Sequence, residues 1–200
     1  MKNKRKSPVI MQPGELYETQ NGTVEILEWI NSKKVKARFV DTGTIVFSQA
    51  KDYRTGRGVK DMNRRSVYGV GYIGVGQHDT GSGVSGKHDK VYELWRGMIR
   101  RCYAPETHSE ETVAAYKDCY VDERWHSYQN FCDDIQELPG YADWDKNNHK
   151  PFKESWCLDK DILGRPMKKK CYSKETCLFI PVVENSKEAR ARKLGREYTY

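Results

Sequence analysis

The sequence has no apolar run that approaches the length needed to span a membrane, so no transmembrane helix and no membrane partner are expected. Its N-terminal stretch is basic but lacks the apolar core of a secretory signal. We therefore expect a soluble intracellular protein. Hydrophobic residues make up only 37% of the 200 residues, but 13 tyrosines and 5 tryptophans bury a large area each. The length fits one large or two small domains.

The six cysteines include no Cys-x-x-Cys pair, which removes the strongest sequence signature of a zinc site. Without a secretory signal, a framework of disulfides is not expected either. A looser zinc site of Cys157, Cys171, Cys177 and His149 would have a spacing that matches no familiar zinc finger. Free and mostly buried thiols are the simpler interpretation.

The net charge of +7 is unevenly distributed along the chain. Residues 1–89 carry 15 Lys and Arg against 9 Asp and Glu, and residues 151–200 carry 12 against 7. Residues 90–150 are acidic, with 8 against 12. The two basic ends favour a polyanionic partner such as nucleic acid, although ordinary solubilising charge would give a similar pattern.

The N-terminal part reads as a basic flexible arm (1–8) followed by a small β domain (9–62). Turn signals such as Asn21-Gly22 separate four short apolar runs, which predict four strands. So few strands close most naturally into a small SH3-like β-barrel. Residues 63–89 form a glycine-rich connector. Its Gly-Val-Gly repeat lacks the Lys-Ser/Thr of a phosphate-binding loop, so nucleotide binding is discarded.

Two helices are expected next. Apolar side chains recur at helical spacing over residues 90–104 and predict one buried helix face. A second apolar stripe predicts a longer helix over residues 122–138. Residues 143–149 are expected to form a polar excursion rather than part of the core.

Three ordered blocks between residues 90 and 187 carry a family resemblance. They are YELWRGMIRRCY (92–103), YKDCYVDERWHSYQNF (116–131), and Leu158-Asp159-Lys160-Asp161 with Tyr172-Ser173 and Glu175-Thr176-Cys177. Together they resemble HNH-endonuclease-like proteins of bacteriophages, and the front domain with its Tyr-Gly-Val-Gly-Tyr-Ile-Gly connector is similar to what phage members carry. The resemblance implies an α+β protein in which residues 90–200 form an HNH-like ββα domain. It also implies that the protein is located in the cytoplasm of an infected bacterial host.

In an HNH site, a β-hairpin and a helix hold one divalent metal ion, and a histidine on the first strand activates water against a phosphodiester. The resemblance places the strands at 156–162 and 177–182, and it places the helix at 185–193. It implies Asp159 as a ligand of a single Mg²⁺ or other divalent ion, and Asn185 as the closing residue of the motif.

The chain departs from the active pattern at the general base. No histidine follows position 149, and Lys160 occupies the end of the first strand instead. Lys160 would act as a base only if its pKa were strongly depressed. Losing a general base usually costs a factor of about 10²–10⁴ in rate. The sequence therefore favours a hairpin and helix that keep the HNH-like fold but no longer catalyse phosphodiester hydrolysis.

The basic side chains around this module do not depend on the missing histidine. They are expected on the first helix (Arg96, Arg100, Arg101), the hairpin loop (Lys168, Lys169, Lys170) and the last helix (Arg190, Arg192, Lys193). The leading hypothesis is a phage-type protein whose degenerate HNH-like module binds the backbone of double-stranded DNA. Two alternatives stay open. One is an active metal-dependent homing or nicking endonuclease; the other is a factor that binds a host defence or polymerase protein through the acidic middle.

Overall fold

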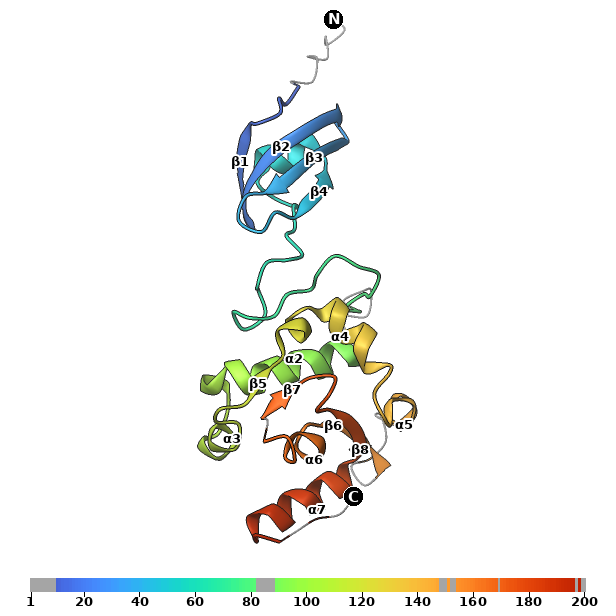
Figure 1. Ribbon diagram of the computed structural model, residues 1–200. Coiled ribbons are helices and arrows are strands. Elements are labelled where there is room, and N and C mark those ends of the chain that lie inside the picture. Colours follow the sequence, from blue (N-terminus) through green and yellow to red (C-terminus); the bar gives the residue numbers. More distant parts are fainter. Residues whose placement is uncertain are drawn as a thin grey trace, which may run out of the picture. The chain divides into compact units, whose positions relative to one another are not determined.

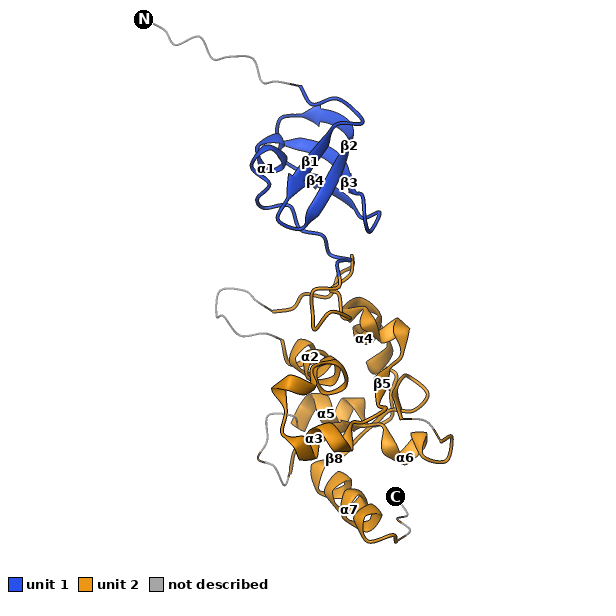
Figure 2. Cartoon of the chain, turned by 90° about the vertical axis from the view of Figure 1, so that its left-hand side faces the viewer, with its two compact units in different colours: residues 1–64 blue, residues 65–200 orange. Residues whose placement is uncertain are grey.

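The computed structural model describes residues 10–81, 89–147, 151, 154–168, 170–196 and 198. The chain separates into two compact units, residues 1–64 and 65–200 (Figure 2). Both units contain strands and helices, so the protein is α+β, as expected. The division falls just after the predicted β domain, and the described part of the connector from residue 65 onward belongs to unit 2. Among the helices described, none combines the length and hydropathy that crossing a bilayer requires.

Unit 1 is a four-stranded antiparallel meander followed by one short helix (Figure 1). Its elements are β1 (Leu16–Thr19), β2 (Gly22–Asn31), β3 (Lys34–Phe39), β4 (Ile45–Ser48) and α1 (Ala50–Thr55). Buried and more exposed side chains alternate along β3, so one face of the sheet covers the core. The buried cluster consists of Met11, Val24, Ile26, Val35, Ala37, Phe39, Ala50, Tyr53 and Val59. The four predicted strands are thereby confirmed.

The sheet of unit 1 is open, which corrects the prediction of a closed barrel. Its strands pair only in chain order, and no described residues join β1 to β4. The segment after α1 lies beside the end of β1 instead. The Gln20 amide donates to the Gly56 carbonyl (2.9 Å), and a Cβ on Gly56 would lie 2.7 Å from the Glu18 carbonyl oxygen. The helix and its last turn therefore take the place that strand closure would occupy.

Unit 2 is built around α2 (Lys90–Tyr103), the helix that the apolar spacing predicted. The Asp89 carboxylate accepts the Val91 amide (2.7 Å) and caps the start of the helix. The buried Trp95 donates its indole N–H to the Trp125 carbonyl (2.8 Å) and packs against the ring of Tyr128. Large side chains that complete this core include Met98, Ile99, Phe131, Ile135, Leu138 and Phe179.

The single helix predicted over residues 122–138 is wrong. The structure has two helices there, η2 (Glu123–His126) and α4 (Tyr128–Ile135). Ser127 between them has an extended backbone. The connector causes the break, because the Tyr72 amide donates to the His126 carbonyl and the Tyr72 carbonyl accepts the Tyr128 amide, both at 2.9 Å. An apolar stripe cannot reveal a backbone bridge made by a distant segment.

The remainder of unit 2 consists of short elements. In chain order they are η1 (Pro105–Thr107), α3 (Glu110–Ala115), β5 (Tyr120–Val121), α5 (Tyr141–Asn147), β6 (Trp156–Asp159), α6 (Asp161–Gly164), β7 (Cys171–Tyr172), β8 (Leu178–Pro181) and α7 (Val182–Lys193). β5 pairs with β7 in parallel, and β6 pairs with β8 antiparallel. α5 corrects the polar excursion predicted for 143–149. Its Trp144 is buried and stacks on Phe179 with ring centroids 4.9 Å apart.

Gly140, which precedes α5, occupies a position where no side chain fits. Its φ is +78°, and a Cβ would collide with the Phe179 carbonyl oxygen. We expect Gly140→Ala to lower the free energy of unfolding by about 2 kcal/mol or more. Urea unfolding followed by tryptophan fluorescence measures this loss of stability, since four of the five tryptophans lie in unit 2. Gly69→Ala is the control, because φ is also positive there (+73°) but nothing lies within 4 Å. Equal losses for both variants would contradict the collision.

Candidate functional site

An antiparallel strand pair and a helix lie where the resemblance places the hairpin and helix, and α6 and β7 stand between the two strands in the chain (Figure 1). β6 pairs with β8 so that Asp159 lies opposite Leu178, and α7 follows β8 directly. Both strands are shorter than predicted. β6 ends at Asp159 because α6 begins at Asp161, so Asp161 does not belong to the first strand predicted over 156–162.

Asp159 is buried and caps the start of α6. Its Oδ2 accepts the backbone amides of Asp161 (2.9 Å) and Ile162 (2.8 Å). Burial raises the pKa of this carboxyl above its ordinary value, and the hydrogen bond from the Ile162 amide offsets part of the rise. An oxygen that accepts two amides at a helix start has a structural role.

Lys160 and Arg192 hold the Asp161 carboxylate between them. The Lys160 ammonium lies 2.6 Å from Oδ1, and Arg192 Nη1 lies 3.0 Å from Oδ2. Burial would lower the pKa of Lys160, but the attraction of Asp161 leaves this pKa above its ordinary value. Burial would raise the pKa of Asp161, but Lys160 and Arg192 hold this pKa below its ordinary value. Lys160 is therefore protonated, which corrects its role as a general base that needed a depressed pKa.

Two tyrosine rings lie against the cations of this region. Lys160 Nζ is 5.4 Å from the ring centroid of Tyr116 and 5.5 Å from that of Tyr172. The Arg101 guanidinium is 5.8 Å from each of the same centroids. Arg101 is half-buried, so it is less available to a phosphate than its prediction as a DNA contact requires. Neither tyrosine was predicted as a site residue from the sequence, because Tyr116 precedes β5 and Tyr172 lies in β7, and the two come together only through the parallel pairing of these strands.

A cavity of about 220 Å³ opens at this cluster. It brings together four residues that the sequence singled out: Asp159, Lys160, Asn185 and Arg192. Tyr116 and Tyr172 form part of its wall. Asn185 reaches it from α7 and donates its side-chain amide to Cys157 Sγ (3.2 Å). The second and third blocks of the family resemblance thus line this cavity, and Arg101 of the first block contacts the two tyrosine rings of its wall.

The remaining predicted DNA contacts lie outside this cavity. Arg190 and Lys193 are exposed near the end of α7, and Lys193 pairs with Glu111 at 3.2 Å. The hairpin-loop lysines Lys168 and Lys170 are exposed, whereas Lys169 lies outside the described residues. The Lys170 ammonium donates to the Lys117 carbonyl (3.2 Å).

The exposed arginines of α2 differ in their surroundings. Arg96 lies over the ring of Tyr68, 5.9 Å from its centroid, and 3.7 Å from the Glu93 carboxylate. Arg100 is exposed one turn further along the helix. Both remain accessible to a phosphate, in contrast to Arg101.

The cavity does not fit a divalent metal ion. Mg²⁺ needs oxygen ligands in a near-octahedral arrangement. Asp159 already caps α6, and Asp161 is neutralised by Lys160 and Arg192, whose charges would also repel the ion. Across the described part of the chain, no group of three or more His, Cys, Asp or Glu side chains could hold a metal. The three cysteines of the looser zinc set are therefore not part of such a group. The fourth member of that set, His149, lies outside the described residues.

The variant Asp159→Asn tests whether Asp159 acts as a helix cap or as a ligand of a catalytic metal ion. The amide oxygen can still accept the Asp161 and Ile162 amides, but it carries no charge. A carboxyl with a raised pKa favours the fold at low pH, and this contribution is lost as the pH rises through the folded-state pKa. We therefore expect Asp159→Asn to be more stable than the wild type at pH 7 in urea unfolding. Asp159→Ala should be about 1 kcal/mol less stable than Asp159→Asn, because it loses the cap. Equal stability of the two variants would exclude the cap.

Comparison with known proteins assigns no family to the chain: no protein-family model, no curated protein and no solved structure matches it. The likeness to HNH-like phage proteins rests on the three sequence blocks.

Proposed function

We propose that unit 2 is a degenerate HNH-like module that binds double-stranded DNA through its backbone and does not cleave it, as part of a phage-type protein that acts in the cytoplasm of an infected bacterium. Unit 1 would be an SH3-like domain ahead of it. The observation that carries this proposal is the state of Lys160. Where the resemblance calls for a histidine base, a protonated lysine is paired with Asp161 beside Arg192.

The last helix supports the binding part of the proposal. Glu188 is the only buried residue among those described in α7, so most of the helix surface is accessible. Arg190 and Lys193 are three residues apart and lie on one side of the helix, and Arg196 follows just after its end. All three side chains are exposed. Cations on an accessible helix can neutralise phosphates and release counterions, which is the main source of affinity for DNA without base readout.

Binding of a fluorescent DNA duplex, measured by anisotropy in EDTA over a range of salt concentrations, tests the proposal. The logarithm of the binding constant should fall linearly with the logarithm of the salt concentration. No binding at low salt, or an affinity that salt does not change, would overturn it.

A plasmid-nicking assay with Mg²⁺ or Mn²⁺ tests the claim that the module is degenerate. We expect no cleavage by the wild type with either metal. Cleavage that disappears in Asp159→Asn, a variant expected to fold, would instead establish an active nuclease.

A further inference from the structure

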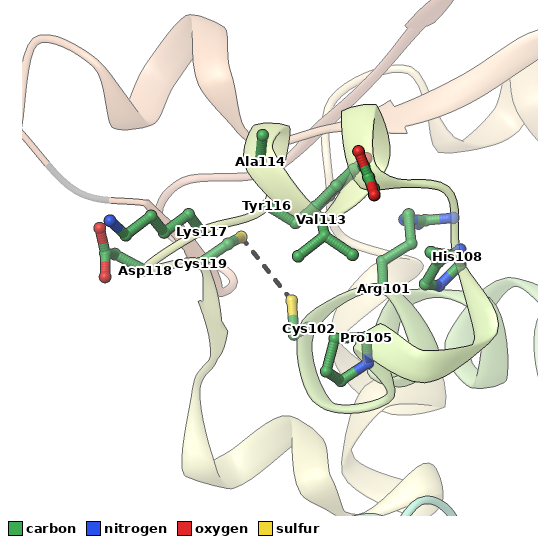
Figure 3. A pocket seen from close by; sticks show the side chains of 11 residues that line it. Arg101, Cys102, Pro105, His108, Val113, Ala114, Tyr116, Lys117, Asp118 and Cys119 are labelled. Atoms are coloured by element: carbon green, nitrogen blue, oxygen red, sulfur yellow. Dashed lines mark hydrogen bonds between the residues drawn. The ribbon is translucent and has the colours of Figure 1, made fainter.

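A second cavity of unit 2, about 550 Å³ in volume, lies between the end of α2 and the segment from α3 to β5 (Figure 3). Two thiols face each other in its wall. Cys102 belongs to the last turn of α2, and Cys119 precedes β5. Their sulfur atoms are 3.7 Å apart, and a dashed line joins them in Figure 3. The cavity gives a small solute access to a pair that would otherwise be enclosed by packing.

The surroundings of the two sulfurs differ. The Cys102 thiol donates a hydrogen bond to Cys119 Sγ, and this bond lowers the pKa of Cys119 below its ordinary value although burial opposes it. The positive charges of Lys160 and Arg101 lower the pKa of both thiols, and the Asp161 carboxylate acts against them at Cys119, so the shared hydrogen bond is what distinguishes the two sulfurs. The same hydrogen bond, together with burial, raises the pKa of Cys102. Cys119 is therefore the better nucleophile of the two.

We propose that Cys102 and Cys119 are a peroxide-reactive dithiol, in which Cys119 is oxidised first and Cys102 then closes an intramolecular disulfide. The Cys119 thiolate attacks one oxygen of hydrogen peroxide, the O–O bond breaks, and a sulfenic acid and hydroxide form. The Cys102 sulfur then attacks the Cys119 sulfur and displaces the hydroxyl, which leaves as water with the Cys102 proton. In total, two thiols and one peroxide give one disulfide and two waters.

The two sulfurs are already close to the separation of a disulfide. An S–S bond of about 2.05 Å requires them to approach by about 1.7 Å from their present 3.7 Å. The bond would tie the end of α2 to the turn that carries Tyr116, the ring that contacts both Lys160 and Arg101. The proposal does not depend on whether unit 2 binds DNA.

Other cysteines of unit 2 provide internal controls. Cys132 is buried, and burial raises its pKa to about 11. Cys177 is fully buried, and burial raises its pKa as well. Neither has the thiol donor and the two cations that favour the thiolate of Cys119, so both should react more slowly.

The test treats the reduced full-length protein with a small excess of hydrogen peroxide, alkylates the remaining thiols and measures the intact mass. We expect four of the six thiols to be alkylated, a mass loss of about 2 Da before alkylation is counted, and a digest fragment that links Cys102 to Cys119. Dithiothreitol should restore all six thiols. Six alkylated thiols under conditions that oxidise glutathione, or a disulfide between other cysteines, would overturn the proposal.

Variants assign the order of the two steps. Cys102→Ser should stop at a sulfenic acid on Cys119, which dimedone traps, and Cys119→Ser should leave Cys102 reduced. Cys132→Ser is the matched control and should form the disulfide at the wild-type rate. Equal peroxide consumption by Cys119→Ser and the wild type would contradict the assigned nucleophile. The wild-type mass measurement decides the main claim even if a variant does not fold.

Discussion

Asp134→Ala is expected to lower the free energy of unfolding of unit 2 by about 3 kcal/mol at neutral pH. Asp134 is 3% exposed and accepts the indole N–H of Trp125 (2.9 Å) and two N–H groups of Arg124 (2.7 and 3.1 Å). Its removal leaves the buried Trp125 indole without this acceptor. The Arg124 side chain is 55% exposed, so solvent screening makes its share of the loss the smaller one.

The pH dependence of this variant has a definite sign. Burial opposes ionisation of Asp134, but the hydrogen bonds from Arg124 and Trp125 hold its pKa below the ordinary value. A lowered carboxyl pKa gives a contribution to stability that is present above the unfolded-state pKa and is lost as the pH falls through the folded-state pKa. The stability difference between wild type and Asp134→Ala should therefore shrink as the pH falls below about 4.

Urea unfolding followed by tryptophan fluorescence at pH 7 and at lower pH measures both effects. Asp133→Ala is the neighbouring control, because its carboxylate is 57% exposed and pairs with His78 at 2.7 Å. It should cost less than about 1 kcal/mol. A loss as large as that of Asp134→Ala would show that charge, rather than the buried hydrogen bonds, sets the stability.

The second large effect concerns DNA. Under the proposed function, replacing Arg190, Lys193 and Arg196 together by alanine should weaken binding on the order of 10²-fold near physiological salt. These three exposed cations were chosen because their loss leaves the Lys160–Asp161–Arg192 cluster intact. If each contacts a phosphate, the slope of log K against log salt should fall by about three. Anisotropy titrations at several salt concentrations give both numbers.

A variant with the same change in net charge separates local contact from overall charge. Lys51, Arg57 and Lys60 are exposed on unit 1, and their joint replacement by alanine removes three positive charges elsewhere. We expect this control to change the affinity by less than about threefold, because screening weakens charges beyond the contact. Similar losses in the two triple variants would mean that α7 is not the contact surface.

The sequence alone predicted the elements that repeat a local pattern. Alternating burial and turn residues located β1 to β4, and helical spacing located α2. The resemblance placed two strands and a helix over residues 156–193, where β6, β8 and α7 lie. The predictions of β1 to β4 and of α2 succeeded because strand and helix periodicity are properties of neighbouring residues. The missing histidine after position 149 was likewise readable from the chain alone.

Tertiary structure decided the features that depend on distant segments. Tyr72 divided the predicted helix at Ser127, since its backbone bonds on both sides of that residue. The segment after α1 lies beside β1, and the sheet stays open. Neither contact could be predicted from hydrophobic periodicity, because each one joins segments that are far apart in the sequence.

The candidate site was also predictable from the sequence only in part. The sequence and its resemblance singled out Asp159, Lys160 and Asn185 for the HNH-like site and Arg192 for DNA contact, and the structure places all four around one cavity. Their chemistry was not recognisable, because a pKa depends on burial and on charges that approach in space. Arg192 reaches Asp161 from α7, and Tyr116 and Tyr172 bring Lys160 and Arg101 to the same rings. The ion pair of Lys160 with Asp161 joins sequence neighbours, but Arg192 and the rings of Tyr116 and Tyr172, which complete the buried cluster around the predicted catalytic lysine, come from segments far away along the chain.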